Sequence, residues 1–356
     1  MSPGRTVRVA AIQPRLELGA VEANLSRAED LVRDAHREHQ PEVILLPEAA
    51  TSPNVYSRLM RDVPRPIDGQ PFQLISRLAR ELDCVVGGGF LSLRGSHAYG
   101  SYVLAEPDGS GNLHDKDIPT VWENNYYRGG SDDGVVDSTS LGRVGIACGW
   151  EWARNRTARR LRAGGVQLLT GGMCWPSFPG NWRGPLGRMM ERERGVQRQL
   201  ARELPRQVAR MIGAPVAMPS HVGDVSFDSP LMPGVPWRTS LIGETQIVER
   251  DGTILARLSY EDGEGHISAE INLAPPEPLD PIPDRFWIPV MPAAIHAVWH
   301  PLNLHGAFKY RAMRLAGKHP WQPYAGGDLP NRIEASSAAT APSATSSGAG
   351  PRRGVR

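Results

Sequence analysis

The chain has 356 residues, of which 40% are hydrophobic and 22% are charged, a composition typical of a soluble globular protein with a sizeable core. Forty Lys and Arg against 38 Asp and Glu leave a formal net charge of +2. This balance argues against nucleic-acid or membrane-surface binding as the main function. We therefore expect no nucleic-acid partner and no membrane partner, and a small molecule is the expected ligand.

The beginning of the chain predicts no secretory signal, because no positively charged start leads into the first apolar run at Val7. No later segment reaches the roughly 18 apolar residues that span a bilayer. The three cysteines, Cys84, Cys148 and Cys174, are odd in number and unrelated in spacing, which indicates reduced thiols. Together these features predict a cytoplasmic protein.

The first half of the chain alternates between two hydrophobic patterns. Short apolar runs bounded by Gly, Pro or polar residues predict strands, and apolar residues at helical spacing between them predict amphipathic helices. The expected strands are 7–12, 43–46, 84–86, 99–104, 144–147 and 166–169, and the expected helices are 21–35 and 72–82.

The second half begins with a long charged helix, expected over 186–212 and divided by Pro205. Strands are expected over 214–218, 245–248, 254–256 and 266–271, and the Asp251-Gly252 pair predicts a hairpin turn. Strands alternating with helices and then following one another favour layered α/β packing in a single domain over residues 1–273.

The C-terminal region changes composition after Leu273. Prolines are frequent over 275–292 and argue against regular structure there, so we interpret residues 274–333 as a Pro-rich arm and a candidate oligomer contact. Residues 334–356 are rich in Ala, Ser, Thr, Pro and Gly, with a basic end. Such a segment cannot bury enough apolar surface to offset the entropy of ordering, and it is expected to be disordered.

Three polar residues each follow an expected strand: Glu48, Lys116 and Cys148. A carboxylate can take the proton of a thiol, and an ammonium can stabilise negative charge that develops on a substrate. Alone, each has an ordinary structural explanation, as a surface carboxylate, a loop charge or a small buried side chain. As a set they predict covalent catalysis with Cys148 as the nucleophile.

The ordered segments Leu-Leu-Pro-Glu48, then Lys116, then Gly-Ile-Ala-Cys148 followed by Trp and Glu resemble the nitrilase superfamily of carbon-nitrogen hydrolases, over residues 6–273. The resemblance implies an αββα sandwich whose protomers form homo-oligomers. It implies Glu48 as general base, Lys116 as the cation that stabilises the oxyanion, and Cys148 as nucleophile. Glu123 matches the second glutamate of the family, which positions the lysine or shuttles a proton.

The mechanism implied by the resemblance is attack of the Cys148 thiolate on an amide carbonyl or a nitrile carbon. A covalent acyl-enzyme forms with loss of ammonia or an amine, and water then releases the acid. No organic cofactor and no metal is expected. His296 and His300 have the spacing of two ligands on one helical face, but Pro301 is expected to interrupt that helix, and surface or interface histidines are the favoured interpretation.

Several positions depart from the family pattern. Asp115 precedes the lysine where a basic residue is common, and a nearby carboxylate alters the electrostatics of a lysine. The usual order of Cys, aromatic and acid is opened by Gly149, and the distance along the chain from Cys148 to Arg159 is one residue longer than usual. We therefore expect the turn at the nucleophile to have a different shape.

The substrate is less well defined by the sequence. Trp122, Gly149, Trp150, Glu151 and Trp175 lie in or near the motif segments and are the expected substrate-binding residues, with an aromatic acyl pocket. An amide or carbamoyl substrate is favoured over a nitrile, although a true nitrilase, an acyltransferase and a catalytically silent binding protein stay open. Cys174, with the small and aromatic neighbours of a pocket wall, is a less favoured nucleophile than Cys148.

Overall fold

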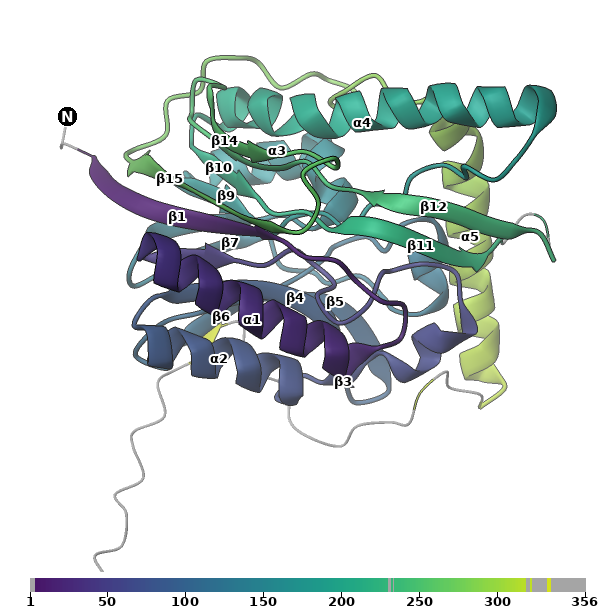
Figure 1. Ribbon diagram of the computed structural model, residues 1–356, viewed down its shortest axis with the longest axis horizontal. Helices are drawn as coiled ribbons and strands as arrows, with labels where there is room; N and C mark the ends of the chain where they lie inside the picture. Colours follow the sequence, from purple (N-terminus) through teal and green to yellow (C-terminus); the bar gives the residue numbers. More distant parts are fainter. Residues whose placement is uncertain (1–3, 230–231, 233, 318–320, 322–331, 334–356) are drawn as a thin grey trace, which may run out of the picture.

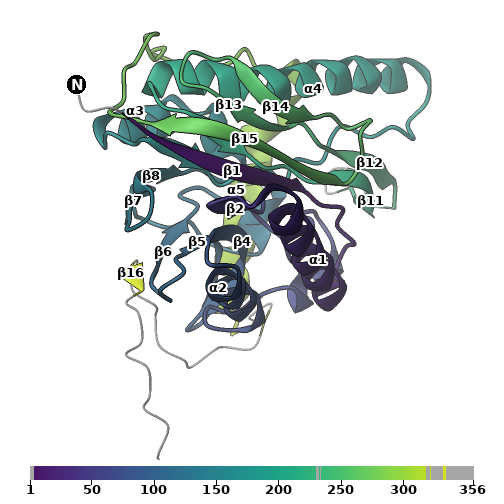
Figure 2. The same cartoon turned by 60° about the vertical axis from the view of Figure 1, so that its left-hand side comes forward.

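The computed structural model describes residues 4–229, 232, 234–317, 321 and 332–333 of the chain. Two β-sheets lie face to face, and a pair of helices covers the outer face of each sheet (Figures 1 and 2). This four-layer arrangement confirms the expected αββα sandwich. The expectation of disorder over 334–356 concerns residues outside the described part.

The first sheet is built mainly from the N-terminal half of the chain, and its outer face is covered by α1 (Val21–His39) and α2 (Gln70–Leu82). The apolar residues of both helices recur at helical spacing, so each helix buries one face against the sheet. The strand order is β15 (Gly265–Leu273), β1 (Arg5–Gln13), β2 (Val43–Leu45), β4 (Val85–Arg94), β5 (His97–Ala105), β6 (Gly111–Asp115) and β16 (Arg332–Ile333), and β3 (Arg65–Pro66) pairs with β4.

The second sheet is covered by α3 (Asn155–Ala163) and α4 (Gly184–Ile212). The predicted turn at 251–252 joins two of its strands as a hairpin. The strand order is β14 (Ile254–Leu258), β13 (Thr245–Val248), β10 (Val216–Met218), β9 (Leu168–Thr170), β8 (Gly142–Ile146) and β7 (Val135–Ser138). A separate hairpin consists of β11 (Val222–Asp228) and β12 (Pro236–Ile242), and short 3-10 helices are η1 (Arg58–Asp62), η2 (Val121–Asn125) and η3 (Gly149–Ala153).

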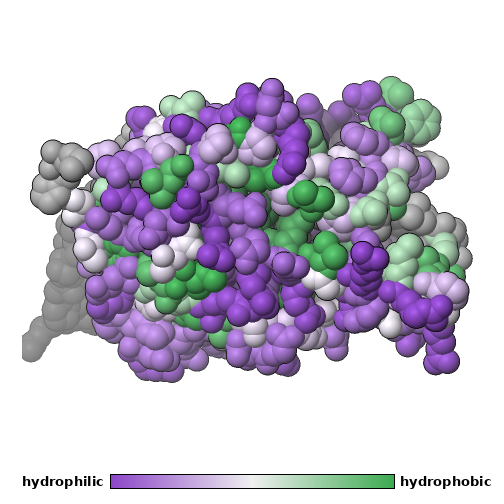
Figure 3. Space-filling model, turned by 90° about the horizontal axis from the view of Figure 1, so that it is seen from above, coloured by the Kyte–Doolittle hydropathy of each residue, from purple (hydrophilic) through white to green (hydrophobic). Residues whose placement is uncertain are grey.

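The long helix α4 is continuous, which corrects the expectation that Pro205 divides it. A proline inside a helix leaves the carbonyl four residues earlier without its backbone donor. Here the side-chain amide of Gln246 donates to the carbonyl oxygens of Ala201 and Arg202, at 3.4 and 3.2 Å. A tertiary contact therefore replaces the bond that Pro205 cannot make. Seen from the α4 side, the surface is mainly polar with scattered apolar side chains (Figure 3), as expected of an outer-layer helix.

The C-terminal arm contains no helix or strand over 274–292, as its prolines predict, and then forms α5 (Ala293–Leu315). The helix continues through Pro301, which corrects the expected interruption. The carbonyl that Pro301 cannot serve belongs to the exposed residue Ala297, where water can satisfy it. His296 and His300 are exposed on this helix. Within the described part of the chain, no helix is long and apolar enough to cross a bilayer.

Candidate active site

Three of the predicted catalytic residues meet in a buried cluster. The Lys116 ammonium lies 2.8 and 3.0 Å from the two carboxylate oxygens of Glu123 and 3.4 Å from Oε2 of Glu48. All three side chains are buried. Glu48 follows β2 and Lys116 follows β6, so these two charged residues lie at strand ends of the first sheet. The third, Glu123, belongs to η2.

Glu48 is held by backbone groups from the second sheet's side of the molecule. Its own N–H donates to the Gly171 carbonyl at 2.9 Å, and its Oε1 accepts from the Cys174 N–H at 3.0 Å. Burial raises the pKa of Glu48 to about 7; the Lys116 charge opposes this rise and the Glu123 charge adds to it. A carboxyl group with this pKa can both accept and donate a proton near neutral pH.

Glu123 fixes the lysine through a capping box at the start of η2. Its Oε2 accepts from both the backbone N–H and the hydroxyl of Thr120, each at 2.7 Å. Burial alone would lower the pKa of Lys116, but the charges of Glu123 and Glu48 outweigh it and the pKa is raised. Lys116 therefore stays protonated beside two carboxylates.

Asp115 does not face this cluster, although it precedes Lys116. Successive side chains of a strand point to opposite faces, and Asp115 pairs instead with Arg94 and accepts from the Ser101 hydroxyl at 2.6 Å. Asp115 therefore forms a separate ion pair with Arg94 on the other face of the strand and does not contact Lys116 directly.

The turn after β8 places Gly149 directly against the charged cluster, whereas the Cys148 thiol lies between the sheets, near enough to interact electrostatically with Glu48 and Lys116. Val144, Ile146 and Cys148 belong to the core between the two sheets, whereas Ala147 packs in the core on the opposite face. This alternation places the next residue, Gly149, on the side of the cluster. A β-carbon built on Gly149 would lie 2.4 Å from Oε1 of Glu48 and 2.9 Å from Nζ of Lys116. The position that faces the base and the cation therefore carries no side chain.

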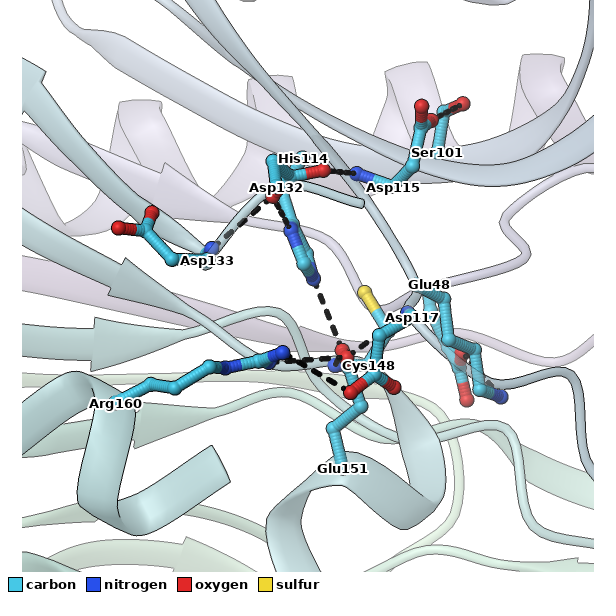
Figure 4. Close-up of polar contacts among 12 residues, drawn as sticks. Glu48, Ser101, His114, Asp115, Asp117, Asp132, Asp133, Cys148, Glu151 and Arg160 are labelled. Atoms are coloured by element: carbon cyan, nitrogen blue, oxygen red, sulfur yellow. Dashed lines mark hydrogen bonds and ion pairs between the residues drawn. The ribbon is translucent and has the colours of Figure 1, made fainter. Parts of the chain in front are cut away.

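The Cys148 thiol lies instead beside a buried network around His114 and Glu151 (Figure 4). Nε2 of His114 contacts Glu151 at 3.0 Å, and the other ring nitrogen contacts Asp132. Burial disfavours ionisation of both partners, yet their mutual attraction raises the pKa of His114 well above its usual value and lowers that of Glu151. His114, Cys148 and Glu151 are one of two groups of described residues whose donor atoms lie close enough together to hold a metal. In this group both ring nitrogens of His114 are already engaged, by Asp132 and Glu151.

Glu151 holds the backbone of the turn that follows β8. Its carboxylate accepts from the Cys148 N–H at 2.9 Å and from the Asp117 N–H at 3.1 Å. Figure 4 shows the Arg160 guanidinium approaching the same carboxylate. Because Glu151 is fully buried and outside the cavity, it shapes the backbone around Cys148 and Gly149.

A cavity of about 50 Å³ opens on the charged cluster. The predicted aromatic residues Trp122, Trp150 and Trp175 all line it, and the rings of Trp150 and Trp175 stack with centroids 4.2 Å apart. Gly149 and Cys148 are not among its lining residues. Sequence reasoning missed several wall residues, because they come from loops, α4, β12 and the arm with no motif of their own: Asn54, Phe178, Gln197, Trp237, Ile295 and Val298.

The arm completes one side of the cavity. Trp287 and Trp299 pack edge-on against Trp150, each with ring centroids 5.7 Å from it. Asn303 of α5 accepts from the Val121 backbone N–H and from the Asn124 side chain, which ties the helix to η2. The described part of the arm therefore covers the chain's own site.

The cavity wall contains a polar atom without a partner in the described structure. Nδ2 of Asn54 donates to the Glu123 carboxylate at 3.3 Å, which fixes the orientation of the amide because a carboxylate only accepts. The opposite atom, Oδ1, is buried and has no hydrogen bond with any described residue. A buried acceptor of this kind needs a donor, which a bound ligand can provide.

An αββα sandwich that gathers a Glu, a Lys and a second Glu beside an aromatic cavity defines a carbon-nitrogen hydrolase of the nitrilase type. The sequence model of the carbon-nitrogen hydrolase family matches residues 8–277. The chain therefore belongs to this family.

Individual relatives are more distant. A cyanide hydratase from Gibberella baccata is 34% identical over 121 residues, and the match spans about a third of each chain (33% of both). A carbon-nitrogen hydrolase structure from Helicobacter pylori G27 superimposes with a TM-score of 0.63 at 18% identity, covering 76% of this chain and 90% of that one. An amidase from Nesterenkonia sp. AN1 superimposes with a TM-score of 0.56 at 16% identity, covering 78% and 96%. These structural similarities concern the fold.

Proposed function

We propose that the cavity binds a small amide and hydrolyses its carbon-nitrogen bond, with Glu48 transferring protons and Lys116 stabilising the oxyanion. The observation that carries this proposal is the buried contact of Glu48 with Lys116 at the floor of an aromatic cavity. In such a water-poor site a fixed cation stabilises developing negative charge far more than in water.

The proton transfers follow from the two carboxylates. Glu48, with a pKa of about 7, accepts a proton from the attacking group and returns one to the departing nitrogen. Glu123 keeps Lys116 protonated and directed at the substrate oxygen. Trp150 and Trp175 offer an apolar, flat surface for the acyl group.

The free acceptor of Asn54 favours an amide over a nitrile. A carboxamide carries N–H donors that can satisfy Oδ1 of Asn54 while its oxygen faces Lys116, whereas a nitrile has no donor to offer. The nitrile alternative finds support in the relative named cyanide hydratase, which matches the chain over a third of its length. Nitrilase activity is therefore the competing substrate hypothesis.

Binding without turnover is a second candidate function, and Gly149 is the observation that favours it. The Nesterenkonia amidase has an active-site cysteine to which acrylamide adds, whereas here the residue that faces Glu48 and Lys116 has no side chain. Such a protein would retain the cavity and its charges for ligand recognition alone.

Ammonia release from a panel of small amides and nitriles, measured with the full chain, tests these hypotheses. We expect release from amides and at least about a 100-fold loss of rate in Glu48→Gln. Glu42→Gln, which alters an exposed carboxylate at the start of β2, is the matched control with an unchanged rate. Saturable thermal stabilisation by an amide without any ammonia would contradict hydrolysis and support binding alone.

We further propose that the protein forms homo-oligomers through the arm and is cytoplasmic. Leu304, Phe308 and Leu315 expose 72, 74 and 90% of their surface on α5, and exposed apolar side chains of this size are typical of interfaces. Light scattering of the parent and of Phe308→Glu tests the oligomer. A monomeric parent would exclude it.

A further inference from the structure

The first turns of α5 supply part of the cavity wall from outside the region that matches the family. The family match ends at residue 277, whereas α5 begins at Ala293. Ile295 and Val298 of this helix line the cavity together with Glu48 and Lys116. Residues three apart lie on one face of a helix. This part of the wall therefore comes from a segment that the family match does not include.

Hydrogen bonds hold α5 in place on both sides of this wall. Before the helix, the Ile288 N–H donates to the Ala153 carbonyl at 2.7 Å. Beyond the wall, Asn303 of the same helix accepts from the Val121 N–H. Ile295 itself is buried, with 7% of its surface exposed. Because the helix is fixed at both places, we expect this wall to resist displacement by a larger ligand.

The space between the walls is small. The cavity has a volume of about 50 Å³, and a single water molecule needs about 10–15 Å³ of such space. The cavity therefore holds roughly four or five non-hydrogen atoms, which is about the size of acetamide or propionamide. An aromatic amide such as benzamide is too large for it.

We infer that Ile295 and Val298 limit the length of the acyl group, so that the substrates are aliphatic carboxamides with about two or three carbons. This inference rests on the proposed amide substrate and adds its size. With the amide oxygen toward Lys116 and the nitrogen toward Asn54, the acyl group faces the rest of the wall, to which α5 contributes. Each methylene group beyond the limit should weaken binding about 10-fold or more.

Linear carboxamides from acetamide to hexanamide are the probes, and ligand-observed NMR gives their dissociation constants. The measurement uses the full chain with Glu48→Gln, which prevents turnover. With α5 unchanged, we expect propionamide to bind at least about 10-fold more tightly than pentanamide. In Ile295→Ala, which removes most of the side chain from the wall, this ratio should fall to about 1. Val298→Ala should lower the ratio less, because Val298 is only partly buried.

Leu302→Ala is the matched control, because Leu302 is a buried residue of the same helix that does not line the cavity. It should lower the thermal unfolding temperature about as much as Ile295→Ala and keep the original ratio. Ile295→Val is a smaller truncation that protects the fold, and its ratio should lie between the two values. An unchanged ratio in both Ile295 variants, or an equal change in Leu302→Ala, would contradict the inference.

Ammonia release by chains that retain Glu48 separates this inference from the proposed function. We expect kcat/KM to follow the same order of chain length and to shift toward longer amides in Ile295→Ala. Equal ammonia release from short and long amides in the parent would refute the size limit and leave amide hydrolysis standing. Binding that shifts with Ile295, without ammonia from any amide, would refute hydrolysis and leave the size limit. Absence of binding by every amide would overturn both.

Discussion

Gly149 turns its α-carbon toward Glu48, so that a β-carbon on this residue would lie 2.4 Å from the carboxylate oxygen Oε1. Its φ of +56° lies in the left-handed region that favours glycine. The residue is thus held in a sharp turn directly opposite the base. The atoms nearest to such a β-carbon are the ends of the flexible side chains of Glu48 and Lys116, which can move aside.

Gly149→Cys is therefore expected to fold and to place a thiol against the base and the cation. The positive φ and the crowding should lower the free energy of unfolding by about 1–3 kcal/mol, measured by urea denaturation. The new thiol should react with acrylamide faster than Cys148 does, because it faces the cavity. Peptide mapping after timed alkylation gives both rates.

Gly165→Cys is the matched control for backbone strain. Gly165 has a similar φ of +67° but no atom within 4 Å of a built β-carbon. Its substitution should cost only the strain of the left-handed conformation, about 1 kcal/mol. Equal destabilisation in the two variants would show that Gly149 is not crowded by Glu48.

The sequence partly predicted the shape of the turn after β8. It did not predict on which side of the strand the Cys148 side chain lies. The extra residue between Cys148 and Arg159 predicts an altered turn, and a one-residue shift exchanges the two faces of a strand. Val144 and Ile146 share the face of Cys148 between the sheets. The ordered motif segments favour Cys148 as nucleophile, whereas alternation along β8 places Gly149 on the side of Glu48 and Lys116.

The αββα layers were predictable because local periodicity carries them. The continuity of α4 and α5 through their prolines was not predictable. In α4, the group that compensates for Pro205 is the Gln246 side chain, 41 residues away along the chain. The same holds for the arm, whose Trp299 and Asn303 reach the site through tertiary contacts. The spacing of residues along the chain does not predict such tertiary contacts.

The free energy of unfolding should depend on pH because burial raises the pKa of Glu48. Its pKa is raised from 4.5 to about 7, so between these values the folded state binds more protons than the unfolded state. Stability must therefore fall as pH rises from about 4.5 to about 7 for this group. Activity should rise over the upper part of the same window, because the ionised carboxylate is the proposed proton acceptor.

Glu48→Gln removes the titration and tests both effects. Urea denaturation at pH 5 and pH 8 should show a smaller loss of stability with pH in Glu48→Gln than in the parent. The pH profile of kcat/KM for the parent should have an acidic limb near pH 7. A parent whose stability is equally pH-dependent with and without this carboxyl group would show that Glu48 does not titrate in this range.

Lys116→Met should destabilise the fold by about 3–5 kcal/mol, because it leaves the carboxylates of Glu48 and Glu123 buried without their cation. The double variant Lys116→Met/Glu123→Gln should recover part of this loss by removing one charge. Lys309→Met, at a partly exposed lysine on α5, should change stability by no more than about 0.5 kcal/mol. Urea unfolding of the three variants decides; no recovery in the double variant would place the loss outside charge pairing.

The contact of α5 with η2 should matter for catalysis, although Asn303 lies outside the cavity. Asn303→Ala removes the acceptor of the Val121 N–H, and Val121 has a φ of +54°, which is unusual for a β-branched residue. Loss of the bond should cost about 1–3 kcal/mol of stability and let the capping box that fixes Glu123 relax. We expect kcat to fall more than KM rises, since Lys116 would lose its fixed position. His305→Ala, on the exposed side of the same helix, should leave both constants unchanged; equal kinetics in the two variants would confine the arm to a structural role.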